Sequence, residues 1–212
     1  MIAASRRADI ARLVELVASN TTGRVIVDRI SRELELPASS VRRYLTVLEH
    51  AFVVVSLTPW HSSRTSRTTK SPSMLLTDSG VAASLLNESS KSLADGTNSM
   101  TGPLVENFVA MELVKQAAWS SRAPRLHHFR TKDGVEVDIV AEAAGIGIMG
   151  IEVKARTTVR DGDFKGLRHM QARLGDRFRA GAVLHCGTTT IQWAPGLWAL
   201  PISALWTVGR HD

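Results

Sequence analysis

Carboxylates and a lysine recur at a spacing of two residues in two β-type stretches of the chain. Glu136 and Asp138 stand in one run rich in valine, and Glu152 and Lys154 stand in the next. Because side chains alternate across a strand, the two members of each pair share one face. If the strands form a hairpin through the turn at 143–145, three carboxylates and one ammonium group come close together.

Such a cluster needs a compensating cation, because buried like charges are costly. Carboxylate oxygens are the ligands that Mg²⁺ and Mn²⁺ prefer. We therefore expect the cluster to hold Mg²⁺ (or Mn²⁺) and Lys154 to orient or help deprotonate a water that attacks a phosphodiester. Each pair alone would also suit an exposed, salt-bridged strand, so the prediction depends on the combination.

A fourth acid belongs to this set. Apolar spacing predicts a helix over residues 104–118, and steps of about 100° per residue place Glu106 at the centre of its apolar arc. A carboxylate in that position needs a partner. Glu106 is therefore added to the cluster as a fourth acid.

The first third of the chain has a different character. Five of the six net positive charges lie in residues 1–72, which suggests a polyanionic partner. Apolar periodicity predicts helices over 8–19 and 25–36, and a third helix capped by Ser39 or Ser40 that ends at His50. Strand-like runs at 52–57 and 74–77 follow.

Three helices and a hairpin are the layout of a winged helix-turn-helix, whose second paired helix enters the major groove of DNA. The expected DNA contacts lie on the third helix and at the hairpin tip. A small packing or dimerisation module has the same layout, so this alternative stays open. The expected contact residues are Arg42, Arg43, Arg64, Arg67 and Lys70.

The pattern of helices and strands expected in the second half of the chain predicts a mixed α/β domain. We expect a winged-helix domain over 1–88, a polar linker over 89–101 and a mixed-sheet domain over 102–212. The order helix, three strands, helix and strand favours this α/β (α+β) class. The expected elements are a helix at 104–118, strands at 125–130, 136–142 and 146–154, a helix at 164–174, a strand at 178–185, and shorter strands at 190–193 and 197–200.

Several classes of protein are excluded or disfavoured. One cysteine allows no internal disulfide, and no apolar run approaches the roughly 18–20 residues that cross a membrane. With no signal-peptide pattern at the N-terminus, a cytoplasmic protein is expected. The glycines at 145–150 match a dinucleotide fingerprint but run into a strand, which is the wrong context. We expect His127 and His128 to form a surface pair, and the oligomeric state is left open.

The order Glu106, Asp138, Glu152-Val153-Lys154 resembles the PD-(D/E)XK nuclease superfamily. The whole chain resembles the C-terminal half of a bacterial and archaeal AAA-type ATPase family, the part labelled domain of unknown function 4143. The matching stretches are ELELPASSVRRYLTVLEHAFVVVSLTPW, KSPSMLLTDSGVAASLL, GPLVENFVAMELVKQ, FRTKDGVEVDIVAE and IEVKAR.

This resemblance implies a winged helix followed by a restriction-endonuclease-like core. It also implies that Asp138 and Glu152 hold Mg²⁺ and that Lys154 assists the water. Glu106 is the implied helix acid, and we expect it to join Asp138 and Glu152 as a metal ligand. An ATPase domain, in cis or in trans, is the implied partner. Two functions remain open: a Mg²⁺-dependent DNA endonuclease, or a non-catalytic DNA-binding, regulatory or protein-interaction module of that ATPase.

Overall fold

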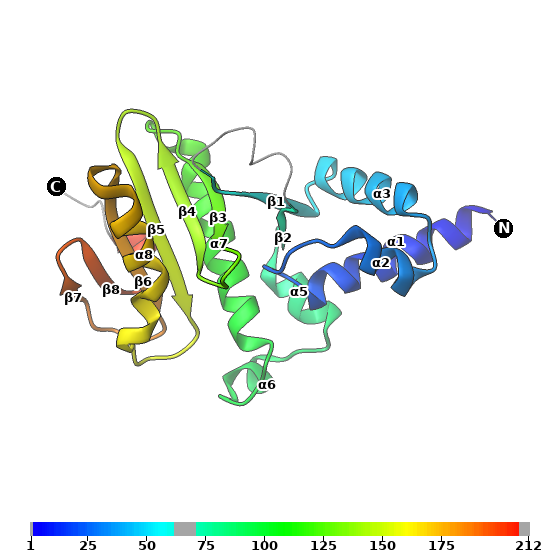
Figure 1. The fold of residues 1–212 in the computed structure, drawn as a ribbon. Helices are drawn as coiled ribbons and strands as arrows, with labels where there is room; N and C mark the ends of the chain where they lie inside the picture. The colour runs from blue at the N-terminus through cyan, green and yellow to red at the C-terminus, as the bar shows by residue number, and fades with distance from the viewer. Residues whose placement is uncertain (1, 62–70, 208–212) are drawn as a thin grey trace. The chain divides into compact units, whose positions relative to one another are not determined.

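The chain is a mixed α/β protein. The structure, a computed structural model, describes residues 2–61 and 71–207, with side chains from Arg6 onward. Within this part of the chain, residues 2–57 and 71–107 form one compact unit, and residues 58–61 and 108–207 form a second. The described strands make one eight-stranded sheet in the order β2-β1-β3-β4-β5-β6-β8-β7 (Figure 1).

The first unit is mostly helical. Its apolar core is drawn from all three N-terminal helices and from the β1–β2 pair, and Leu13 and Val41 are fully buried in it. β1 and β2 pair in antiparallel fashion from Val54 opposite Leu76. The elements are α1 (Ile2–Ser19), α2 (Val27–Leu34), α3 (Ala38–His50), β1 (Val54–Pro59), β2 (Ser73–Leu76), α5 (Ser79–Leu85), α6 (Ser90–Ala94) and the first part of α7 (Thr101–Trp119).

The predicted cap of α3 is wrong. Neither Ser39 nor Ser40 caps the helix, because Pro37 occupies the N-cap position and no side chain makes a cap hydrogen bond. The Pro37 carbonyl accepts from the backbone N–H of Ser40 (2.9 Å) and of Val41 (3.1 Å). The fixed φ of proline suits the start of a helix, so both serines fall inside the first turn.

The stretch expected to be a linker, 89–101, contains α6. Ser89 and Ser92 form a reciprocal cap: the Ser92 N–H donates to Ser89 Oγ (3.1 Å), and the Ser89 N–H donates to Ser92 Oγ (2.8 Å). Such a capping box stabilises a short helix whose side chains bury little apolar surface. The first unit continues past this helix to Asn107.

Asn107 fixes the start of α7 within the first unit. Its side chain is fully buried. The amide oxygen accepts from Thr21 Oγ1 (2.7 Å) and from the Leu76 N–H (3.0 Å), and the amide nitrogen donates to the Leu76 carbonyl (2.9 Å). One polar side chain therefore joins α7, β2 and the turn after α1.

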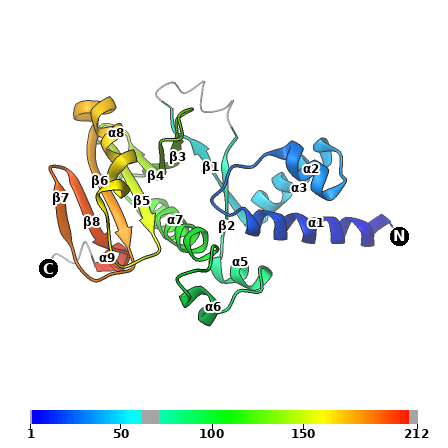
Figure 2. The ribbon, with the colours of Figure 1, turned by 60° about the horizontal axis from the view of Figure 1, so that its bottom comes forward.

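The second unit is a sheet with helices on both faces. Helix α8 covers one face of the central strands, and residues 108–119 of α7 cover the other (Figures 1 and 2). The predicted order of elements is confirmed. They are β3 (Arg125–Arg130), β4 (Glu136–Ala143), β5 (Gly147–Lys154), a 3-10 turn (Asp161–Phe164), α8 (Lys165–Leu174), a second 3-10 turn (Gly175–Arg177), β6 (Phe178–His185), β7 (Ile191–Ala194), β8 (Leu197–Pro201) and α9 (Ala204–Thr207).

The expected surface histidine pair is wrong. His127 and His128 are buried, at 6% and 8% exposure. Strand β3 pairs with β1 on one side and with β4 on the other, so it lies inside the sheet rather than at an edge. The Thr58 hydroxyl lies 2.9 Å from His127 Nδ1.

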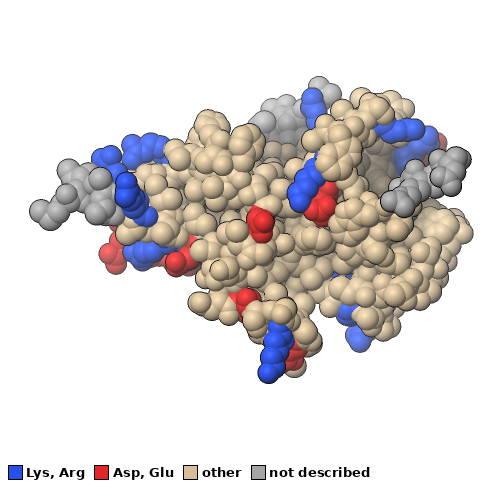
Figure 3. Space-filling model, turned by 180° about the vertical axis from the view of Figure 1, so that it is seen from behind, with Lys and Arg blue, Asp and Glu red and all other residues tan. Residues whose placement is uncertain are grey.

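Two further findings concern membrane-spanning helices and the distribution of surface charge. None of the helices in the described ranges is both long and apolar enough to cross a membrane. On the face drawn in Figure 3, lysine and arginine side chains form several separate groups rather than one continuous patch.

Candidate active site

The predicted β-hairpin is confirmed, and it brings Asp138 next to Glu152. Strands β4 and β5 are antiparallel, with Ile139 opposite Ile151 and Ala143 opposite Gly147. One step further along this register, Asp138 stands beside Glu152. Asp138 Oδ2 accepts a hydrogen bond from the Val153 N–H at 2.8 Å, which fixes the direction of the carboxylate.

The alternation of side chains along β4 is interrupted once. Phe129 pairs with Val137 but His127 pairs with Val140, so β4 has one residue more than β3 in this interval. This irregularity is a β-bulge, a feature that redirects side chains. As a result Val137 and Val140 both enter the core cluster under α8, although an unbroken strand would send them to opposite faces.

Glu152 is a buried acid paired with Lys154. Only 5% of the surface of this residue is exposed to solvent. Lys154 Nζ lies 3.2 Å from Glu152 Oε2, and the lysine side chain is half-buried. Residues 152 and 154 share one face of β5, as the sequence predicted. Helix α8 packs on that face, because a Cβ at Gly166 would lie 3.0 Å from Glu152 Oε1.

Burial raises the pKa of the Glu152 carboxyl to about 9, and the negative charge of Asp138 and a hydrogen bond to that carboxyl add to the increase, while Lys154 opposes it. For Lys154, burial alone would lower the pKa of the ammonium group. The carboxylates of Glu152, Asp138 and Asp163 outweigh this effect, and the pKa is raised. The site therefore keeps Lys154 charged and disfavours a second negative charge beside Asp138.

These side chains line an open pocket of about 210 Å³. The first turn of α8 closes one side of it, because Gly166 has no side chain: a Cβ there would collide with the Glu136 carbonyl and lie 3.0 Å from Glu152 Oε1. The lining residues are Gly134, Val135, Glu136, Asp138, Glu152, Lys154, Gly162, Asp163, Lys165 and Gly166.

Glu136 lines the same pocket but has another partner. Its side chain is 54% exposed, and Oε2 lies 3.0 Å from Arg130 Nη1 across the β3–β4 pair. The third carboxylate expected on the hairpin therefore sits at the solvent side and is neutralised by an arginine.

Glu106 lies on α7, in the part that belongs to the first unit, and is half-buried. Its expected role as a metal ligand stays a prediction. Across the described ranges, no three histidine, cysteine, aspartate or glutamate side chains form a cluster that could hold a metal ion. Asp138 and Glu152 thus form a pair of neighbouring acids, and no third acid, histidine or cysteine joins them in a metal-binding cluster within the described ranges.

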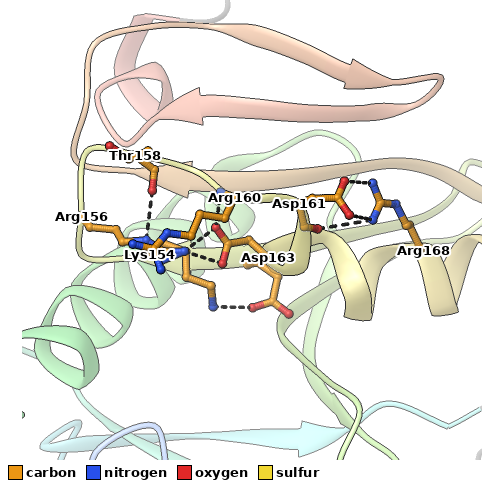
Figure 4. A network of polar contacts seen from close by, with 8 residues as sticks. Lys154, Arg156, Thr158, Arg160, Asp161, Asp163 and Arg168 are labelled. Atoms are coloured by element: carbon orange, nitrogen blue, oxygen red, sulfur yellow. Dashed lines mark hydrogen bonds and ion pairs between the residues drawn. The ribbon is translucent and has the colours of Figure 1, made fainter.

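Asp163 is an acidic pocket residue that the sequence analysis missed. Arg156 Nη2 lies 2.5 Å from each of its carboxylate oxygens, and the Arg160 N–H donates to Oδ2 at 2.7 Å (Figure 4). The available signal was Asp161-Gly162-Asp163 ahead of the predicted helix at 164, which resembles an ordinary acidic helix start.

The structure describes two of the five residues that are expected to contact DNA. Arg42 and Arg43 are exposed on α3. The hairpin-tip residues Arg64, Arg67 and Lys70 lie outside the described residues.

Comparison with known proteins finds a family match in the second half of the chain. The model of the family described as Domain of unknown function (DUF4143) matches residues 101–205. Residues 101–205 form a DUF4143 domain. A second family, described as Domain of unknown function (DUF8612), matches residues 2–92. All four residues of the expected site fall within the DUF4143 match.

Relatives of the chain are longer proteins. An uncharacterised protein of Mycobacterium tuberculosis and one of Mycobacterium bovis are each 30% identical over 184 residues. The alignment covers 86% of this chain and 39% of each relative, so the chain spans well under half of their length. No solved structure matches significantly.

Proposed function

We propose that the DUF4143 domain is a Mg²⁺- or Mn²⁺-dependent phosphodiester hydrolase that acts on DNA. The first unit would act as a winged helix that directs it to its substrate. The observation that carries the proposal is the buried Glu152 carboxyl, held between Asp138 and Lys154 in an open pocket. A purely structural ion pair would not need an adjacent second carboxylate.

The acidic side chains fit a hard divalent cation. Mg²⁺ is usually bound by one or two carboxylates, with water and substrate phosphate completing its coordination. Asp138 and Glu152 supply two carboxylates at neighbouring positions of the hairpin. The raised pKa of Glu152 indicates a position where a second negative charge is unfavourable until a cation compensates for it.

When bound, the metal ion would supply Lewis-acid stabilisation of phosphate charge and lower the pKa of water. Asp138 and Glu152 would bind and orient it. Lys154 keeps its proton, because a hydrogen bond to Glu152 and the nearby charges of Asp138 and Asp163 raise its pKa. Its ammonium group therefore donates hydrogen bonds, and we assign it to the water and to the charge that develops on the phosphate oxygens.

A second function is favoured by one observation. The hydrogen bond from Lys154 to Glu152 and that from the Val153 N–H to Asp138 already satisfy much of the cluster from within the chain. The same residues would therefore suit a non-catalytic DNA-binding or regulatory module. An AAA-type ATPase domain, in cis or in trans, is the partner that we propose for either function, on the strength of the sequence resemblance.

Cleavage of supercoiled plasmid and of labelled single strands, with Mg²⁺ or Mn²⁺, tests the proposal. We expect Asp138→Asn and Lys154→Gln to lower the rate by about 100-fold or more, as loss of a single charge-stabilising group does elsewhere. Asp176→Asn and Lys115→Gln remove the same charges from exposed positions away from the pocket. These controls should cut at the wild-type rate.

Two results would contradict the proposal. Cutting that persists in Asp138→Asn would place the activity elsewhere. Absence of cutting with either metal, while DNA is still retained, would favour the non-catalytic module.

A further inference from the structure

The loop between β5 and α8, residues 155–164, carries two acids that are each neutralised by an arginine. Arg156 binds both carboxylate oxygens of Asp163. Arg168 Nη1 lies 2.8 Å from Asp161 Oδ2. Hydrogen bonds from Arg168 and then Trp193 hold the pKa of Asp161 below its usual range. Figure 4 shows the two pairs side by side along the loop.

The backbone of this loop is fixed as well. The Cys186 N–H donates to the Arg156 carbonyl at 3.0 Å, which ties the loop to the segment after β6. Arg156 Nε donates to the Thr158 carbonyl at 3.0 Å, and Trp193 Nε1 donates to Asp161 Oδ1 at 3.1 Å. The loop thus has a defined conformation before any ligand arrives, which reduces the entropy cost of binding.

Two cationic side chains, one in this loop and one at the start of α8, are available to a ligand. Arg160 and Lys165 are exposed, and neither forms an ion pair with any residue in the described ranges. Lys165 lines the pocket, as does Gly162 between them. A Cβ at Gly162 would meet no atom within 4 Å, so the surface between the two cations is open.

We propose that Arg160 and Lys165 bind the phosphates that flank the one in the pocket. The second unit would then hold a nucleic-acid backbone by its own contacts, in addition to those of the first unit. The inference rests on the proposed function in taking nucleic acid as the substrate. Contacts of this kind position the backbone without reading its sequence, and each one releases condensed counterions.

The salt dependence of DNA binding tests this inference without any need for turnover. The full chain is titrated against a labelled oligonucleotide, single-stranded and duplex, in EDTA at salt concentrations from about 50 to 200 mM. Each lost phosphate contact lowers the slope of log affinity against log salt by about 0.9 for duplex and about 0.7 for single strands. For Arg160→Gln with Lys165→Gln we expect about twice that reduction, and each single variant should give half of it.

The matched control removes two arginines that are exposed in the same unit. Arg173 lies in the last turn of α8 and Arg122 lies in the loop before β3. Arg173→Gln with Arg122→Gln should leave the slope unchanged.

The inference would be overturned if the two double variants gave the same slope. It would also be overturned if the wild type did not bind the oligonucleotide at the lowest salt concentration. A reduced slope in a chain that does not cut DNA would support the contacts while contradicting the nuclease proposal. The two ideas therefore fail separately.

Discussion

At the scale of single residues, the site depends on one carboxyl that the fold has removed from water. Glu152 is 5% exposed, and its neighbours include both an acid and a lysine. Isolated buried charges are costly, so the carboxyl keeps a proton over a wide pH range unless a cation compensates. The chemistry that we propose and the pH dependence of stability therefore have the same origin.

The burial of Glu152 predicts how the stability of the Glu152→Gln variant, relative to the wild type, depends on pH. The folded pKa of about 9 lies above the ordinary value of 4.5. Between these values the folded protein holds a proton that the unfolded chain releases, so wild-type stability falls as pH rises. Glutamine imitates the protonated carboxyl and does not titrate. In EDTA, Glu152→Gln should gain stability relative to the wild type by up to about 1.4 kcal/mol per pH unit.

Denaturant unfolding at about pH 5 and pH 8 measures the difference, and groups that titrate in both proteins cancel from it. Parallel loss of stability in the two proteins would show that Glu152 is ionised in the folded state.

At the scale of elements, the bulge in β4 and the start of α8 shape the pocket. The bulge turns Val137 into the core, and α8 approaches the hairpin closely enough that Gly166 faces the Glu136 carbonyl. Only a glycine leaves room for that approach.

Gly166→Ala should therefore destabilise the protein and distort the pocket. The added methyl group forces α8 away from the hairpin at a cost of about 1–3 kcal/mol, which the better helix propensity of alanine, worth about 1 kcal/mol, only partly offsets. Gly162→Ala is the matched control, since its methyl group would meet open space. Denaturant unfolding should place the control within about 0.5 kcal/mol of the wild type.

If Gly166→Ala proves as stable as Gly162→Ala, the close approach of α8 to the hairpin is not present in solution. DNA cleavage by Gly166→Ala, measured beside the wild type, tests the distortion of the pocket.

At the scale of the whole molecule, the described residues contain two separate apolar cores. One holds α1, α2, α3 and the β1–β2 pair, and the other lies between α8 and the central strands. Because each core is internally continuous, damage to one should be felt mainly in its own unit.

Asn107→Ala tests this separation. The substitution leaves the Leu76 N–H, the Leu76 carbonyl and the Thr21 hydroxyl without their buried partner, at a cost of about 2–4 kcal/mol. Hydrogen exchange should speed up in β1 and β2 and stay unchanged in β4, β5 and β6. Asn20→Ala, at an exposed asparagine of the same unit, is the control. Equal acceleration in both units would show that the two cores unfold together.

The sequence by itself determined most of the secondary structure and the central cluster. Helical and strand periods are local properties, so α7, β3, the β4–β5 hairpin and β6 could be located from them. The spacing of two within each strand also placed Glu152 and Lys154 on one face. Their partner Asp138 followed from the short hairpin turn, because a short turn fixes the register of the strands it joins.

The tertiary structure alone decided the rest. The bulge in β4, the burial of His127 and His128, and the place of Asp163 all arise from contacts between different helices, strands and loops. A bulge depends on the neighbouring strand, burial depends on which strands flank β3, and Asp163 reaches the pocket only because α8 folds back over the sheet. Local spacing carries no information about such contacts, because they are set by how the elements pack.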